Sequence, residues 1–179
     1  MISISEIKTT VPNFFQNDLR KKIYHALCEL SVGFERVDTD EVITMEDCVE
    51  INQKLNMDMV KTLFLCNRRQ TDFYLFITKG NKQFHSKDFS NALGVSRVSF
   101  APAELMEDML GTKIGAATVL SSILDTDNKV KIIFDKEVAC EKYYGCSDGV
   151  TTGYIKLLTD DVINKFLPYT NHKLTIIEV

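Results

Sequence analysis

The sequence of 179 residues is poor in proline and glycine and has no long apolar run. It has only 3 prolines and 8 glycines, which excludes collagen-like and linker-dominated chains. No run approaches 18 consecutive apolar residues, so we expect no membrane-spanning helix. The first six residues, from Met1 to Glu6, lack the basic start and apolar run of a signal peptide. These absences predict a cytoplasmic protein.

Cysteine and histidine are present, but not in the patterns that hold metals. None of the 5 cysteines forms a C-x-x-C pair, and the 3 histidines are scattered along the chain. We therefore expect neither a zinc site nor a disulfide framework, and we interpret the thiols as small buried hydrophobes. The sequence also has no glycine-rich phosphate loop, no G-x-G-x-x-G and no G-x-S-x-G elbow. No metal and no cofactor is expected.

The overall composition is that of one globular domain spanning residues 1–179. The chain is 45% hydrophobic and 26% charged, so it can build one compact core and is not disordered. Its net charge is −4, yet residues 61–97 carry seven basic side chains and only two acidic ones. This basic segment is either a local phosphate-binding face or a solvated hairpin surface. Any contact with RNA should be small, because an extensive grip on a duplex needs far more positive charge.

Hydrophobic periodicity predicts alternating helices and strands. Leu19, Ile23 and Leu27 form one apolar stripe at helical spacing. Together with capping and turn residues, the pattern predicts helices over 17–30, 45–55, 86–93, 101–110, 135–141 and 159–167. It predicts strands over 34–37, 42–43, 61–66, 72–78, 98–100, 123–124, 130–134, 150–157 and 174–179, and a loop over 143–149. Segments 61–78 and 123–134 are expected to form hairpins. The sequence thus predicts an α+β domain around a largely antiparallel sheet.

One glycine-containing segment is a candidate for chemistry. Gly111 and Gly115 lie four residues apart and are followed by small residues as far as Thr118. Successive N–H groups in such a loop can bind a carbonyl oxygen or an anion. The alternative is a glycine that ends a helix, followed by a tightly packed turn.

The chain resembles the YbaK/ProX family of aminoacyl-tRNA editing domains. Residues 61–65 (KTLFL) are similar to its K-N-L-F-L strand, and residues 115–118 (GAAT) to the start of its G-S-V-T-P-F loop. Residues 123–130 (ILDTDNKV) resemble its I-N-D-T-E-G-R-V segment, and Asp148 with residues 150–152 lies where the family has N-T-A-T-T. The resemblance covers nearly the whole chain in order. It points to the ProX/PrdX-type, free-standing relatives of the insertion domain of prolyl-tRNA synthetase.

This resemblance implies a mixed α+β fold with a mostly antiparallel, barrel-like sheet and surrounding helices. It also implies a trans-editing deacylase, which hydrolyses the ester of mischarged tRNA for proline, usually alanyl-tRNA. A synthetase pocket for proline cannot strongly reject a smaller amino acid, so a second sieve is useful. The implied partners are the tRNA acceptor end and prolyl-tRNA synthetase, with no membrane and no DNA.

The resemblance also assigns roles to residues. Lys61 would hold the phosphate or ribose of the terminal adenosine or favour charge on the ester, and the N–H groups of Gly115 and Ala116 would cradle the ester carbonyl. The residues expected to bind substrate are Thr62, Gly111, Thr118, Tyr144 and Asp148. An ordered water or the ribose hydroxyl of the tRNA would replace a side-chain nucleophile. All of this requires that Lys61 and the glycine bend face each other across a cavity.

Departures from the family pattern leave alternatives open. Thr62 and Asp148 stand where the family has asparagine, Val119 where it has proline, and Tyr144 where it has a histidine that helps to select small amino acids. One alternative is therefore a non-catalytic module that binds tRNA or aminoacyl-adenosine. Another is a deacylase for a serine or cysteine ester. Cys146 as a nucleophile is a further, weaker hypothesis, since no histidine is near it in sequence.

Overall fold

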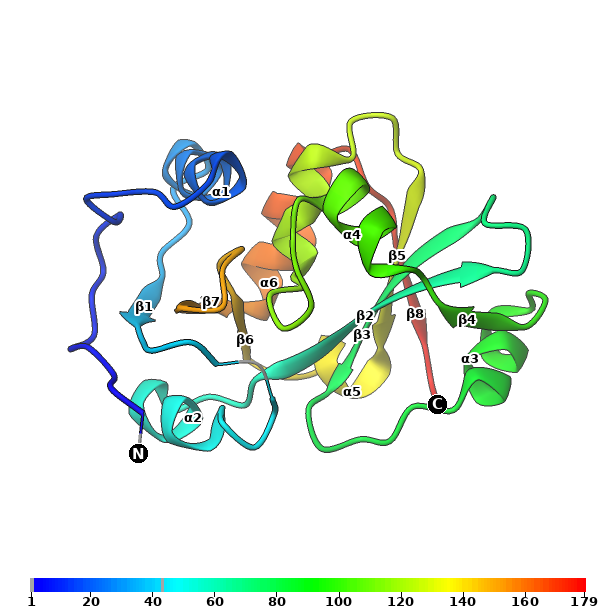
Figure 1. The fold of residues 1–179 in the computed structure, drawn as a ribbon, viewed down its shortest axis with the longest axis horizontal. Coiled ribbons are helices and arrows are strands. Elements are labelled where there is room, and N and C mark those ends of the chain that lie inside the picture. Colours follow the sequence, from blue (N-terminus) through cyan, green and yellow to red (C-terminus); the bar gives the residue numbers. More distant parts are fainter. Residues whose placement is uncertain (1, 43) are drawn as a thin grey trace.

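The computed structural model describes residues 2–42 and 44–179. It contains two β-sheets (Figure 1). The smaller sheet is antiparallel, in the order β1-β7-β6, and the larger has the order β4-β2-β3-β5-β8. The strands are β1 (Glu35–Asp38), β2 (Val60–Asn67), β3 (Phe73–Lys79), β4 (Val98–Phe100), β5 (Val130–Asp135), β6 (Tyr143–Ser147), β7 (Gly153–Leu158) and β8 (Leu174–Ile177).

The helices surround these sheets, as the predicted α+β class requires. The longer ones are α1 (Asp18–Glu29), α2 (Val49–Leu55), α3 (Ser86–Leu93) and α4 (Ala103–Leu110). Shorter turns are η1 (Val119–Leu124, a 3-10 helix), α5 (Lys136–Ala139), α6 (Thr159–Asp161), η2 (Val162–Phe166, a π-helical turn) and α7 (Leu167–Tyr169). In the described part of the chain, no helix has the length and apolar character needed to cross a membrane.

Three details of the sequence-based strand assignment are wrong. Residues 123–124 belong to η1 and not to a hairpin, and β5 pairs in parallel with both β3 and β8. The turn before β5 is closed by the Asp125 carboxylate, which accepts hydrogen bonds from the Lys129 and Val130 amides. The predicted loop over 143–149 contains β6, which pairs with β7. Of the predicted strand 42–43, Ile43 lies outside the described residues.

Strand β2 separates two of the hydrophobic clusters. Phe64 and Cys66 pack into the cluster that includes α1 and α4, whereas Leu65 packs into the cluster that includes Phe89 of α3. Side chains alternate between the faces of a strand, so Thr62 shares the first face with Phe64. Lys61 therefore lies on the opposite face of β2 from Thr62.

The two sheets meet where β2 begins. Met59 forms an isolated parallel bridge with Gly145 of β6. A Cβ at Gly145 would lie 2.5 Å from the Met57 Sδ atom and 3.1 Å from the Asp58 carbonyl oxygen. A larger residue at this position would displace the Met57 side chain and crowd the Asp58 carbonyl, so glycine favours the close approach of the chain before β2 to β6.

Candidate functional site

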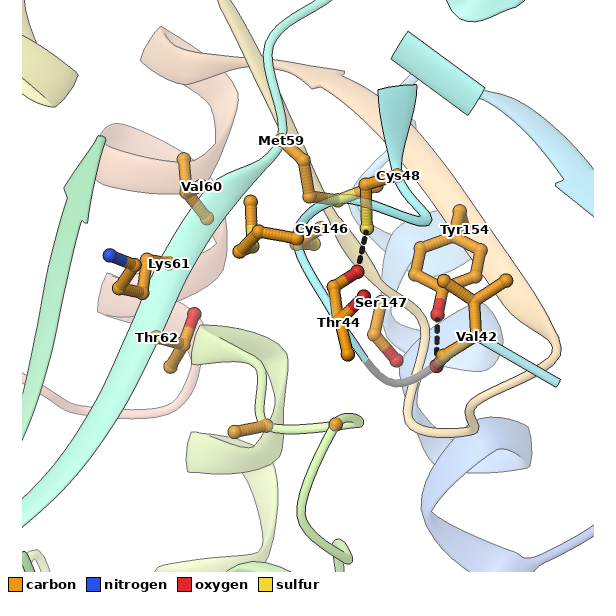
Figure 2. Close-up of a pocket in the computed structure, with 13 residues that line it drawn as sticks. Val42, Thr44, Cys48, Met59, Val60, Lys61, Thr62, Cys146, Ser147 and Tyr154 are labelled. Atoms are coloured by element: carbon orange, nitrogen blue, oxygen red, sulfur yellow. Dashed lines mark hydrogen bonds between the residues drawn. The ribbon is translucent and has the colours of Figure 1, made fainter. Parts of the chain in front are cut away.

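A small cavity lies at this junction of the two sheets. Its volume is about 180 Å³. Figure 2 shows that its walls come from the start of β2, from β6 and β7, and from segments between the regular elements. The described residues that line it are Val42, Thr44, Met45, Cys48, Met59, Val60, Lys61, Thr62, Gly115, Ala117, Cys146, Ser147 and Tyr154. Three of the residues predicted from sequence, namely Lys61, Thr62 and Gly115, are thus brought together.

The glycine bend contributes Gly115 to the cavity lining. Gly115 has a φ of +90°, a conformation that favours glycine. The amide of Ala116 donates to the Lys113 carbonyl at 3.0 Å, so the predicted cradle cannot use it in this conformation. For the Gly115 amide no acceptor exists among residues 2–42 and 44–179. Gly115 is therefore the available member of the predicted pair.

The side chain of Lys61 already has a partner within the protein. Its ammonium donates to the Lys82 carbonyl at 2.7 Å. Figure 2 shows the Nζ atom pointing away from Cys146, Ser147 and Tyr154. Lys61 and Gly115 line the same cavity, and that the ammonium itself faces the bend stays a prediction. Alternation of side chains along β2 puts Lys61 and Thr62 on opposite faces of the strand.

Lys61 also lines a second, larger hollow next to the cavity. This groove has a volume of about 1120 Å³ and lies between α2, the start of β2 and the segment from α5 to β6. Its lining includes the amide side chains of Asn52, Gln53, Asn56 and Asn81, and it shares Met45, Met59, Val60 and Lys61 with the small cavity. Lys61 thus stands on the border of two spaces that share part of their lining.

The two thiols in the cavity wall are poor nucleophiles. Burial raises the pKa of Cys48 to about 11 and that of Cys146 to about 12. Both are therefore protonated near neutral pH, when only the thiolate attacks carbonyl carbons readily. No histidine, aspartate or glutamate is among the described residues that line the cavity. The hypothesis of a Cys146 nucleophile finds no base to support it.

Three hydroxyl groups in the wall already have partners. Tyr154 donates to the Val42 carbonyl at 3.0 Å, Ser147 to the Val150 carbonyl at 2.8 Å, and Thr44 to the Asp47 carboxylate at 2.8 Å. The remaining lining is mostly carbon and sulfur. The cavity thus presents a largely apolar wall to any group that enters it.

Tyr144 lies behind the cavity wall and not in it. Its side chain is fully buried and stacks on Phe134 with ring centroids 5.7 Å apart. Burial raises its pKa well above the usual value, Cys146 raises it further, and Thr62 lowers it. Because Thr62 and Cys146 both line the cavity, Tyr144 supports their positions from inside. The direct substrate contact expected for Tyr144 is not available in this arrangement.

Asp148 is likewise buried away from the cavity. Its Oδ2 atom accepts from the Arg20 Nε atom at 2.9 Å and from the Tyr24 hydroxyl at 2.5 Å. Asp148 has no exposed surface, and Arg20 is only 2% exposed. The negative charge of Asp148 is therefore paired within the protein. This ion pair joins α1 to the chain that follows Ser147.

The other two predicted binding residues have structural roles. Gly111 ends α4 with a φ of +64°, and a Cβ there would lie 2.6 Å from the Leu124 Cδ1 atom. The Thr118 hydroxyl accepts from the Leu120 amide at 3.3 Å and caps η1. Neither residue lines the cavity.

Sequence reasoning missed most of the cavity wall. Cys48, Met59, Ser147 and Tyr154 come from segments that are far apart in the chain. None stands in a pattern that indicates chemistry, and only the pairing of β6 with β7 and the Met59 bridge bring them together.

Comparison with known proteins shows which family the sequence matches. The sequence model described as "Aminoacyl-tRNA editing domain" matches residues 39–165. The prolyl-tRNA editing protein ProX of Acetoanaerobium sticklandii is 25% identical over 122 residues, which cover 68% of this chain and 74% of that protein. The mouse prolyl-tRNA synthetase associated domain-containing protein 1 is 30% identical over 133 residues, which cover 72% and 78%.

A solved structure shows that the fold is shared as well. A crystal structure described as a putative trans-editing enzyme for prolyl tRNA synthetase superimposes with a TM-score of 0.64. The match covers 92% of this chain and 99% of the other, at 12% sequence identity. At that identity the likeness concerns the fold alone.

Proposed function

Since this chain belongs to the aminoacyl-tRNA editing domain family, we propose that it hydrolyses the ester between a wrong amino acid and the tRNA for proline, with alanine as the amino acid. The observation that carries the proposal is the small cavity in which Thr62, Gly115 and the border residue Lys61 meet. An editing site needs a space for one amino acid, a donor for the ester oxygen and room for the terminal nucleotide beside it. The two adjoining spaces supply these parts.

The size and walls of the cavity favour alanine. Pockets for drug-sized ligands have volumes of about 300–1,000 Å³, so the cavity of about 180 Å³ suits a single small group. Three of the four hydroxyl groups in the described lining, those of Thr44, Ser147 and Tyr154, already donate to other groups of the protein, which leaves Thr62 to meet the hydroxyl of a seryl ester. A methyl group fits this lining without leaving a polar atom unpaired. A cysteinyl ester, whose thiol behaves as a small hydrophobe, is the second candidate substrate.

In the proposed reaction the carbonyl oxygen of the ester faces the Gly115 amide. A water molecule attacks the carbonyl carbon, and negative charge develops on this oxygen opposite the amide. The bond between carbon and ribose oxygen then breaks. The proton that the water loses reaches the departing ribose oxygen by way of the neighbouring ribose hydroxyl, so free amino acid and uncharged tRNA result. Loss of one donor of this kind costs about 3 kcal/mol in the barrier.

Lys61 serves binding in this proposal. Its ammonium donates to the Lys82 carbonyl, on the face of β2 opposite Thr62. Its bond to the Lys82 carbonyl involves a neutral acceptor, so a phosphate of the terminal nucleotide can replace that carbonyl. Of the two roles considered from sequence, contact with the phosphate or ribose of the terminal adenosine agrees better with this placement.

A panel of charged tRNAs tests the proposal. The tRNA for proline is charged with alanine, serine, cysteine or proline, and release of free amino acid is measured. We expect alanine to be released fastest and proline to be retained. Release of no amino acid, with the tRNA still bound, would favour the non-catalytic binding module instead.

Two variants test the assigned roles. Gly115→Ala should reduce kcat by about a hundredfold, because it strains the bend and displaces its amide. Gly94→Ala is the matched control, since Gly94 also has a positive φ of +71° but a Cβ there meets nothing within 4 Å. Lys61→Ala should reduce kcat/KM by roughly 10- to 100-fold, the loss expected for a charged hydrogen bond. Unchanged activity in Lys61→Ala would remove the role assigned to this lysine.

A further inference from the structure

The exposed arginines of this chain all lie at one end of the β2–β3 hairpin. The sequence contains five arginines. Arg20 and Arg36 are buried, and both form ion pairs with aspartates. The other three, Arg68, Arg69 and Arg97, are exposed. They belong to the basic segment 61–97, whose charge the cavity does not explain.

The register of the sheet brings these three side chains together. Arg68 and Arg69 follow directly after β2, in the turn that leads to β3. Asn67 pairs with Val98 of β4, so Arg68 and Arg97 are the next residues on two neighbouring strands. Figure 1 shows this turn projecting from the rest of the protein beside the segment that leads into β4. We call these three residues the arginine tip.

In the part of the chain that the structure describes, no acidic side chain forms an ion pair with the arginine tip. The nearest carboxylate in sequence is that of Asp72, which instead accepts a hydrogen bond from the Asn67 Nδ2 atom at 2.9 Å and pairs with Lys131 at 3.2 Å. Within residues 2–42 and 44–179, none of the three guanidinium groups forms an ion pair. Like charges side by side on neighbouring strands are unfavourable. A neighbouring anion would relieve this repulsion.

The position of the tip relative to the cavity identifies the anion. Lys61 and Asn67 lie six residues apart on one strand, which corresponds to about 20 Å. Along the axis of a nucleic-acid helix, the phosphates of one strand follow one another every ~3.4 Å, so this span corresponds to roughly six phosphates. A tRNA with its 3′ end in the cavity would thus present the first base pairs of its acceptor stem at this distance. Guanidinium groups match phosphates in two-bond geometry, unlike the lysines that are spread over the rest of the surface.

We infer that the arginine tip binds the phosphate backbone of the acceptor stem while the ester lies in the cavity. This inference rests on the proposed function and adds the docking surface to it. The inference agrees with the net charge of −4, because a phosphate-binding contact made by three residues does not require a large basic surface. Backbone contacts of this kind position the substrate and do not read its sequence.

The experiment compares two triple variants that lose the same charge. The first replaces the arginine tip: Arg68→Gln, Arg69→Gln and Arg97→Gln. The control replaces exposed lysines on other elements: Lys22→Gln, Lys165→Gln and Lys173→Gln. Each is assayed on full-length alanyl-tRNA and on the alanyl ester of the CCA trinucleotide, which contains the 3′ end but no stem.

We expect the tip variant to raise KM for the full-length tRNA at least tenfold, with kcat unchanged. On the trinucleotide ester, wild type, tip variant and control should agree within twofold. The slope of log affinity against log salt concentration should fall by about two to three in the tip variant, since each phosphate contact contributes about 0.7–0.9. A tip variant that behaves like the control on full-length tRNA would overturn the inference.

Binding of uncharged tRNA separates this inference from the proposed function. If wild type hydrolyses no ester, the same loss of affinity and of salt slope in the tip variant still supports the phosphate contact. If the tip variant keeps its affinity for tRNA but no longer binds prolyl-tRNA synthetase, the partner is an acidic protein surface, and the inference is overturned.

Discussion

Replacing Asp148 by asparagine separates a structural from a substrate-binding role for this residue. In the structure, Asp148 accepts from the Arg20 Nε atom at 2.9 Å and from the Tyr24 hydroxyl at 2.5 Å. The Arg20 Nη2 atom lies 2.8 Å from the same oxygen, Oδ2, and no exposed surface remains on Asp148. Asparagine keeps an acceptor at this position but removes the negative charge.

The expected cost follows from what remains around Arg20. Removing one partner of a buried ion pair costs about 3–5 kcal/mol when the other charge stays unpaired. Arg20 keeps a second partner, Asp38, at 3.0 Å, and Asp38 is partly exposed. We therefore expect Asp148→Asn to lower the free energy of unfolding by about 2–3 kcal/mol. In a chain of this size, that lowers Tm by roughly 4–12 °C.

Urea unfolding followed by far-UV circular dichroism measures this change, since the chain contains no tryptophan. Arg20→Met should cost about 3–5 kcal/mol, because it leaves Asp148 buried without its cation. The double variant should cost at least about 2 kcal/mol less than the two single variants together, because the residues share one interaction. In folded enzyme, KM for tRNA should stay within a fewfold of wild type. An unchanged stability of Asp148→Asn combined with a large change in KM would refute this reasoning and restore the substrate-binding role.

Three further predictions concern the glycine at the end of α4 and the thiols of the cavity. Gly111→Ala should lower the free energy of unfolding by at least about 1 kcal/mol more than Gly94→Ala. Both glycines have a positive φ, but only at Gly111 would a Cβ lie 2.6 Å from the Leu124 side chain. Equal losses in urea unfolding would contradict this prediction. Cys146→Ala should keep deacylase activity within about tenfold, whereas a loss of a thousandfold or more would identify a nucleophile. The folded pKa values of Cys48 and Cys146 are raised to about 11 and 12 from an ordinary value of 9.0, so unfolded thiols ionise first. Their contribution to stability is complete below pH 9.0 and is lost as pH rises toward 12, which unfolding curves at successive pH values can check; stability that rises over this range would contradict the shifts.

Local signals predicted most of the helices and strands. The stripe of Leu19, Ile23 and Leu27 predicted α1, and the residue before the helix, Asn17, caps it as such residues do. Gly94 and Gly111 end α3 and α4 with positive φ, as their positions in the sequence indicated. These features depend on interactions between residues a few positions apart, so a single sequence reveals them.

The partners of the strands were not predictable in the same way. An antiparallel hairpin was expected before β5, but β5 pairs in parallel with β3 and β8. A parallel pair joins segments that are distant in sequence, and no turn residue signals it. The loop predicted over 143–149 contains β6, because residues 143–147 are held in an extended conformation by pairing with β7.

The sequence by itself determined the class of the fold, the segments that carry the family resemblance, and the concentration of positive charge in residues 61–97. Only the tertiary structure decided which of the residues in the family-like segments lie together at the cavity. It placed Thr62 and Gly115 at the cavity, turned the ammonium of Lys61 to the other face of β2, and buried Tyr144 and Asp148 in the core. The physical reason is that a side chain's direction depends on strand register and on contacts between distant segments, which the local pattern of residues does not contain.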